Sequence, residues 1–339
     1  HPRNTAIFAP TFEGEGVLRL HDVTADSRYG RNDPHFGMPE GHLPVRSYLA
    51  VPVISGTKEV LGGLFLGHAE PGRFDQRAER LVTGIAQHAA SALDAVRLFE
   101  GEHRLALQLQ RTLLPRTLPP IPGLEIAARY QPASELAEVG GDWYDVTRLP
   151  DGTVSITVGD VAGHDLRAAS TMGRLRHALQ LYALDGFRPV EALERVDRLM
   201  ARAGIAETAT ALHGILDPES GTLELCRAGH PSPLILRADG TREWPEPTRY
   251  GGPLLGGSTG SEPRTTLVVH LEPGDAVVLF TDGLVERPQE LLDDGIARLV
   301  AAAAGCQGRS AADTCDLLIE ELVGTENRDD VVVLAVKVV

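Results

Sequence analysis

A cluster of prolines divides this chain into two parts with different sequence patterns. The cluster consists of Pro115, Pro119, Pro120 and Pro122. Because proline cannot continue an α-helix, a helix that approaches from the N-terminal side must end here. The 339 residues are typical of two or three domains. We therefore expect a first domain over 1–90, a linker helix over 91–120 and a second domain over 121–339.

The part before the prolines combines short strands with a long helix. Apolar β-type runs cover 48–53 and 60–66, and the turn-forming residues between them predict a hairpin. Residues 75–114 show the spacing of a helix. In its second half, spacings of 7, 4 and 4 indicate a narrow coiled-coil seam of Leu98, Leu105, Leu109 and Leu113. Two arrangements stay open: a homodimer through 91–114, or packing of the seam in cis on the preceding sheet.

The part after the prolines reads as an α+β domain. Strand-like runs joined by short turns are separated from blocks of helix, which favours antiparallel sheets over a βαβ repeat. Strands are predicted over 124–130, 143–149, 153–159, 208–216, 222–228, 233–237, 265–271, 275–281 and 331–336. Helices are predicted over 165–183, 189–203, 288–304 and 311–323.

Charge and composition exclude several classes of protein. Hydrophobic residues make up 42% of the chain, enough for a buried core, and no apolar run approaches the 18 residues of a membrane span. The formal net charge is −15. Residues 1–115 carry 12 basic and 13 acidic side chains, so nearly all of this charge lies in the second part, at −14. An acidic domain disfavours nucleic acid as a partner, and with it a two-metal nuclease.

The cysteines indicate the cellular compartment, and the first residues indicate how the chain begins. Cys226, Cys306 and Cys315 are odd in number and lack metal-site spacing, so we expect buried thiols in a reducing cytoplasm. The chain begins at His1 without Met and without a signal segment, and we expect a fragment start.

Four acidic motifs of the second part carry the chemistry. They are Gly140-Gly141-Asp142-Trp143-Tyr144-Asp145, Val158-Gly159-Asp160-Val161-Ala162-Gly163-His164, Phe280-Thr281-Asp282-Gly283 and Asn327-Arg328-Asp329-Asp330-Val331. Glycine beside a carboxylate lets the backbone approach a ligand closely. Carboxylates that converge without His or Cys suit Mg²⁺ or Mn²⁺, and two such ions about 3.5–4 Å apart can activate a shared water. The alternative is that these acids cap turns and helices, which we prefer for Asp165.

With the entry segment 109–115 and the motif AGHPSPL at 228–234, these motifs resemble the SpoIIE/RsbU-type serine/threonine phosphatases, a branch of the PP2C (PPM) metal-dependent superfamily. The resemblance implies a β-sandwich flanked by helices, with two Mn²⁺ or Mg²⁺ ions at one edge. It implies that Asp160 bridges both metals, that the Val161 carbonyl completes one shell, and that Asp142 acts from the first motif. Asp282 and Asp329 would hold the second metal, with Asp329 favoured over Asp330.

The resemblance further implies a metal-bridging water as the attacking group, with no covalent phosphoenzyme. The substrate would be a phosphorylated STAS-domain anti-anti-sigma factor in a partner-switching system. One departure is that the second motif continues as His164-Asp165 where the family usually closes with glycine. This leaves a rival hypothesis open, a phosphatase-like scaffold that binds its regulator without hydrolysis.

Residues 41–53, the strand at 62–64 and the helix after them resemble a partial GAF domain, which implies a sensor for an unknown small molecule or signal. The helix would transmit that signal to the phosphatase. Three further assignments stay open: Arg129 and Arg167 as phosphate-binding candidates by location, His164 and His230 as structural rather than general-acid residues, and 237–265 as a flap or a passive surface loop.

Overall fold

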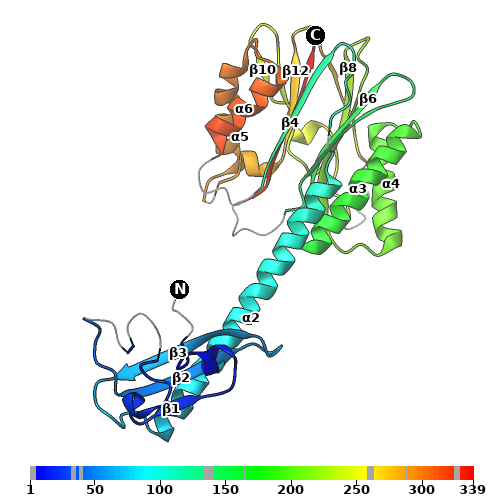
Figure 1. Ribbon diagram of the computed structural model, residues 1–339. Coiled ribbons are helices and arrows are strands. Elements are labelled where there is room, and N and C mark those ends of the chain that lie inside the picture. Colours follow the sequence, from blue (N-terminus) through cyan, green and yellow to red (C-terminus); the bar gives the residue numbers. More distant parts are fainter. Residues whose placement is uncertain are drawn as a thin grey trace. The chain divides into compact units, whose positions relative to one another are not determined.

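The computed structural model forms two compact units, His1–Glu102 and His103–Val339 (Figure 1). It describes residues 5–31, 36–37, 41–115, 117–132, 140–163, 165–257, 263–287, 289–323 and 329–339, and for 102–111 it gives the backbone alone. None of the described helices combines the length and the apolar composition needed to cross a membrane.

The first unit is a three-stranded antiparallel sheet packed on a long helix. The sheet order is β1-β2-β3, and the elements are α1 (Ala9–Phe12), β1 (Leu18–Leu20), η1 (Val23–Ala25), β2 (Ser47–Ile54), β3 (Val60–His68) and α2 (Gln76–Leu113). One face of β2 packs on α2 through Leu49, Val51 and Val82. The opposite face is covered by Ile7 and Val23. Because β2 is buried on both faces, its sequence is a continuous apolar run, and the predicted hairpin with β3 is confirmed.

The second unit is a sandwich of two five-stranded antiparallel sheets. Their orders are β10-β9-β12-β13-β4 and β11-β8-β7-β6-β5. The strands are β4 (Leu124–Gln131), β5 (Trp143–Arg148), β6 (Val154–Val161), β7 (Ala209–Leu216), β8 (Thr222–Ala228), β9 (Leu234–Leu236), β10 (Arg242–Glu243), β11 (Leu267–His270), β12 (Ala276–Phe280) and β13 (Val331–Val338). The helices are α3 (Leu166–Leu184), α4 (Pro189–Ala203), η2 (Pro247–Arg249), η3 (Asp282–Leu284), α5 (Leu292–Ala302), η4 (Ala303–Cys306) and α6 (Ala311–Leu322). The predicted α+β class is confirmed.

Apolar side chains fill three layers of this unit. Between the sheets, Ile156 of β6 and Leu334 of β13 belong to the central core. The helices α3 and α4 cover the outer face of one sheet, and α5 and α6 cover the other (Figure 1). The three cysteines are buried and unpaired, as expected. With both faces of each sheet covered, the central strands carry apolar residues on both sides.

The last turn of α2 belongs to the core of the second unit. Leu114 packs in the same cluster as Trp143 of β5. A Cβ placed on Gly173 of α3 would lie 2.9 Å from the Leu113 side chain, so α3 approaches this turn closely. Leu113 of the predicted seam therefore packs in the core of the second unit and not on the preceding sheet. Leu98 is 71% exposed, and the side chains of the other two seam leucines lie outside the described residues.

A buried histidine makes stability depend on pH. His213 of β7 is fully buried, with Nδ1 2.7 Å from Thr157 Oγ1, and burial lowers its pKa from 6.5 to about 4. Only the unfolded chain gains a proton as the pH falls from 6.5 toward 4, so stability is lost in that window and unaffected by this group above it. The slope due to His213 approaches about 1.4 kcal/mol per pH unit. We expect His213→Gln to remove this slope from urea-unfolding curves, whereas His270→Gln, at an exposed site, leaves it unchanged. Equal slopes in wild type and His213→Gln would contradict the assignment.

Candidate active site

The predicted acids meet at one end of the sandwich, two from each sheet. Asp142 directly precedes β5 and Asp160 is the penultimate residue of β6, and the pairing of Trp143 with Gly159 brings them to the same end of their sheet. In the other sheet, Asp282 follows β12 and opens η3, while Asp329 lies just before β13. The pairing of β12 with β13 places these two acids together.

Glycines let the acid-bearing segments approach one another. A Cβ on Gly141 would lie 2.2 Å from the Val161 carbonyl oxygen. A Cβ on Gly283 would lie 2.2 Å from the backbone oxygen of Asp330, and one on Gly140 would lie 2.5 Å from its carboxylate. Real side chains do not tolerate such distances, so the glycines of these motifs are required by close packing. The arrangement also puts the Val161 carbonyl beside the loop that carries Asp142.

Burial and mutual repulsion disfavour the charged forms of these carboxyl groups. Burial raises the pKa of Asp142 well above its usual range, and the charges of Asp160 and Asp330 add to the effect. Burial and the charges of Asp282 and Asp329 likewise raise the pKa of Asp160. Charges act in this way only over short distances, so the carboxylates of both sheets form one electrostatic cluster. A bound cation would reverse these effects.

One oxygen of this cluster lacks a partner. Asp142 is 2% exposed, and its Oδ2 has no hydrogen-bond partner among the described residues. By contrast, Asp282 Oδ1 accepts from Gly283 N at 3.0 Å and Asp329 Oδ1 accepts from Asp330 N at 2.8 Å. In the described part of the chain, no three His, Cys, Asp or Glu side chains are arranged as they stand to hold a metal ion. The orphaned oxygen and the all-carboxylate donor set nevertheless fit a hard divalent cation.

Residues 150–339, more than half of the chain, match the family model of Stage II sporulation protein E. The chain belongs to the SpoIIE family. Asp160, Asp282 and Asp329 lie inside the matched stretch, and Asp142 lies just before it. Residues 13–94 match the GAF domain model, which confirms the resemblance of the first unit.

Relatives of this SpoIIE-family chain include a phosphoserine phosphatase. The chain is 25% identical over 292 residues to Protein IcfG of Synechocystis sp., covering 76% of this chain and 44% of IcfG. It is 27% identical over 189 residues to the phosphoserine phosphatase RsbU of Bacillus subtilis, covering 55% of this chain and 54% of RsbU. The crystal structure of the RsbU and RsbW domains of Rv1364c from Mycobacterium tuberculosis matches with a TM-score of 0.58 and 38% identity, over 67% of this chain and 63% of that chain. The chain spans about half the length of the curated relatives it matches.

Asp330, which the sequence motif ranks below Asp329 as a ligand, has a contact that the sequence does not reveal. Tyr130 of β4 donates a short hydrogen bond to Asp330 Oδ2, and Asp330 is 2% exposed. The tyrosine thus holds this carboxylate against the edge strand β4. The two residues are 200 positions apart, and no local motif marks Tyr130.

His230 of the AGHPSPL motif joins the two sheets beside the acids. Its Nε2 lies 2.9 Å from the Phe280 carbonyl, which can only accept, so Nε2 carries the proton and Nδ1 accepts from Thr210 Oγ1 at 2.8 Å. Burial lowers the pKa of His230 to about 4 and keeps the ring neutral. Thr210 is the register partner of Asp160, and Phe280 is two residues from Asp282. These bonds favour a structural role for His230.

The structure shows the contacts of two of the remaining candidate residues, Asp165 and Arg129. Asp165 is the N-cap of α3, where its Oδ1 accepts from the backbone N–H groups of Arg167 and Ala168, so the expected capping role is confirmed. Arg129 forms a bidentate ion pair with Asp316 of α6, at 2.6 and 2.8 Å. Arg167 is exposed at the start of α3 and stays a candidate phosphate ligand. His164 lies outside the described residues.

Contacts hold the described part of 237–265 in place. Arg227 of β8 donates two hydrogen bonds to the first carbonyl of η2. Arg264 forms an ion pair with Asp197 of α4 and donates to the Pro253 carbonyl at 2.6 Å. Both contacts favour a fixed surface loop over a flap.

Proposed function

We propose that this chain is a metal-dependent serine/threonine phosphoprotein phosphatase. The observation that carries the proposal is the buried, unpartnered Oδ2 of Asp142 within a cluster of carboxylates from both sheets. Membership of the SpoIIE family and the likeness to a phosphoserine phosphatase, RsbU, support the same activity.

We assign the metal-binding role to the side chains of Asp142, Asp160, Asp282 and Asp329, together with the Val161 carbonyl. These ligands would hold two divalent cations, Mn²⁺ or Mg²⁺, because both metals prefer oxygen donors. When bound, such ions lower the pKa of a water and neutralise charge on the phosphoryl group. The chain itself contributes the buried position of Asp142 and the close approach of Gly141 to Val161.

We assign the substrate as a phosphorylated STAS anti-anti-sigma factor, on the family resemblance. The GAF unit would sense a small molecule or signal, and α2 would transmit it within a cytoplasmic partner-switching system. The homodimer through 91–114 belongs to the same proposal. Exposure of Leu98 leaves the middle of that helix available for it.

Metal dependence tests the proposal directly. We expect Mn²⁺-dependent release of phosphate from a phosphoserine peptide, loss of this activity in EDTA and its return when Mn²⁺ is added in excess, because a bound divalent cation would activate the attacking water. Phosphate release is followed colorimetrically. Activity that survives EDTA would contradict the metal assignment, and Mn²⁺ binding without hydrolysis would favour the scaffold hypothesis.

A further inference from the structure

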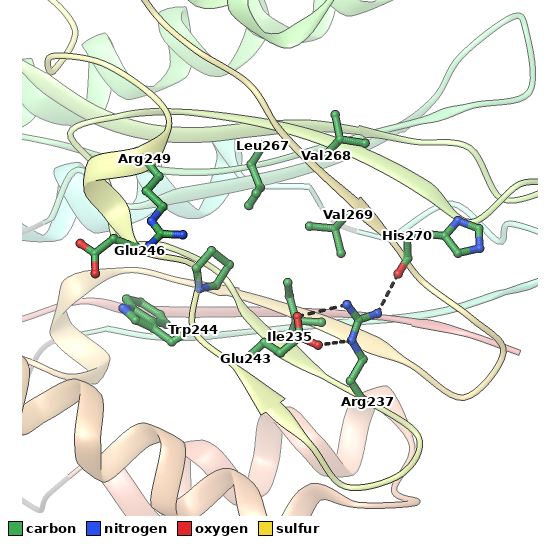
Figure 2. Close-up of a pocket in the computed structure, with 11 residues that line it drawn as sticks. Ile235, Arg237, Glu243, Trp244, Glu246, Arg249, Leu267, Val268, Val269 and His270 are labelled. Atoms are coloured by element: carbon green, nitrogen blue, oxygen red, sulfur yellow. Dashed lines mark hydrogen bonds and ion pairs between the residues drawn. The ribbon is translucent and has the colours of Figure 1, made fainter.

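A groove opens along the edge of the sandwich where β10 and β11 lie (Figure 2). Its volume is about 550 Å³, within the range of ligand-binding sites. We call it the edge groove, and the residues that matter here are Ile235, Trp244, Arg249, Leu267, Val268 and Val269. In the described chain, β10 pairs with β9 alone and β11 with β8 alone, so each is the edge strand of its sheet.

The backbone of β11 offers hydrogen-bonding groups to this groove. Leu271 N donates to Gly221 O at 2.8 Å, which makes that pair a hydrogen-bonded one. Because such pairs alternate with non-bonded pairs in an antiparallel ladder, the backbone N–H and C=O groups of Val268 and His270 point outward from the edge. Arg237 already donates to the His270 carbonyl at 2.7 Å. Val268, with its side chain 64% exposed, is the position at which another strand can pair.

Arg249 provides the charge at one end of the groove. Glu246 lines the same end, and its carboxylate accepts a hydrogen bond from Thr248 Oγ1 at 3.1 Å. The Arg249 guanidinium is exposed and has no ion pair or hydrogen bond among the described residues. Arg237, at the other end, is bound to Glu243 at 2.6 Å (Figure 2). It is also bound to Asp275 at 2.8 Å. In a domain of net charge −14, Arg249 is therefore the groove's available partner for an anionic group.

The groove lies along the same sheet that carries Asp282 and Asp329. β10 is two strands away from β12 in the sheet order, a separation of about 10 Å. At its near end, the Trp244 ring packs on Phe280 with a centroid distance of 5.9 Å. Phe280 ends β12, two residues before Asp282. One substrate chain can therefore place a segment in the groove and its phosphoserine at the acidic cluster.

We propose that the edge groove docks an extended segment of the phosphoprotein substrate. The segment adds as a strand to β11 at Val268 and places alternate apolar side chains on Leu267, Val269 and Ile235. A carboxylate of the segment pairs with Arg249. This inference rests on the proposed function, since its occupant is the substrate of that reaction.

Peptide binding to the full chain tests the groove without reference to catalysis. The probe is a fluorescein-labelled ten-residue peptide of alternating Val and Glu, measured by fluorescence anisotropy. We expect Arg249→Glu to weaken binding about tenfold through charge reversal and Val268→Pro to weaken it about fivefold through loss of an outward N–H. Proline is tolerated at such an edge position. Arg242→Glu is the matched control, because Arg242 is an exposed β10 residue outside the groove, and it should leave binding unchanged.

Hydrolysis separates failure of this inference from failure of the proposed function. With a phosphoserine peptide that carries the same extension, Arg249→Glu should raise KM several-fold and leave kcat unchanged. Hydrolysis of p-nitrophenyl phosphate should be equal in all variants.

Peptide binding that is the same in wild type and in both groove variants would overturn the docking site, even where hydrolysis is normal. A shift from dimer to monomer in Val268→Pro would assign the edge to a second copy of the chain and overturn the proposal as well. Groove-dependent binding without hydrolysis would instead contradict the phosphatase assignment.

Discussion

Asp160→Asn should reduce hydrolysis of a phosphoserine peptide by about a thousandfold. Asp160 lies in β6 at the centre of the cluster, where its charge interacts with those of Asp282 and Asp329 from the other sheet. If Asp160 is a metal ligand, as proposed, its removal should weaken both metal binding and the stabilisation of the transition state. Isothermal titration with Mn²⁺ should show a matching loss of affinity, which a change in protein–substrate contacts would not produce.

Asp165→Asn is the matched control for this substitution. It makes the same change of carboxylate to amide only five residues away, at a position that caps α3. Asparagine is as good an N-cap as aspartate, so stability and activity should both be retained. Full activity in Asp160→Asn, or equal losses in both variants, would contradict the special role of Asp160.

Gly141→Ala should have the largest effect among conservative changes near the site. The added Cβ would lie 2.2 Å from the Val161 carbonyl oxygen and 2.7 Å from its backbone nitrogen, and backbone atoms cannot move aside as a side chain can. We expect a cost of about 3 kcal/mol or more, which corresponds to a fall in Tm of about 6–12 °C. The loop that carries Asp142 would move away from β6, so Mn²⁺ affinity should fall as well.

The matched control is Gly84→Ala, since a Cβ on Gly84 of α2 would have no other atom within 4 Å. There alanine should stabilise the helix by up to about 1 kcal/mol. Differential scanning calorimetry of both variants, with and without Mn²⁺, provides the measurement. A wild-type Tm in Gly141→Ala would show that the two segments are not in close contact.

Much of the fold is predictable because its strands have long apolar runs. β13, expected over 331–336, spans Val331–Val338, and the continuous apolar run of its first six residues follows from burial on both faces. β10 is not predicted, since its two polar residues, Arg242–Glu243, carry no pattern. The helix predicted over 288–304 is shorter: α5 covers Leu292–Ala302 and tightens into η4. No side chain caps its first turn, so the sequence marks no clear start.

The acidic motifs predict which chemistry to expect, because a glycine beside a carboxylate is itself a sign that two backbone segments approach closely. Their convergence from two sheets depends on strand pairing, such as that of β12 with β13, which local patterns do not encode. The hydrogen bond from Tyr130 to Asp330 and the two hydrogen bonds of His230 are likewise not encoded by local patterns. Each joins segments distant in sequence through a single polar contact, and a residue type alone does not reveal such a partner.

The last turn of α2 determines at which residue the first unit can be replaced without damage to the second unit. Because Leu114 belongs to the same core cluster as Trp143 and Leu113 lies close to Gly173, the second unit includes the end of the helix that precedes its first strand. A chain cut at 121 would lose part of its own core and should be less stable, whereas one cut at 103 keeps it. We therefore expect the preceding unit to be exchangeable at a junction within the helix upstream of Leu113, and not at the prolines that mark the boundary in the sequence.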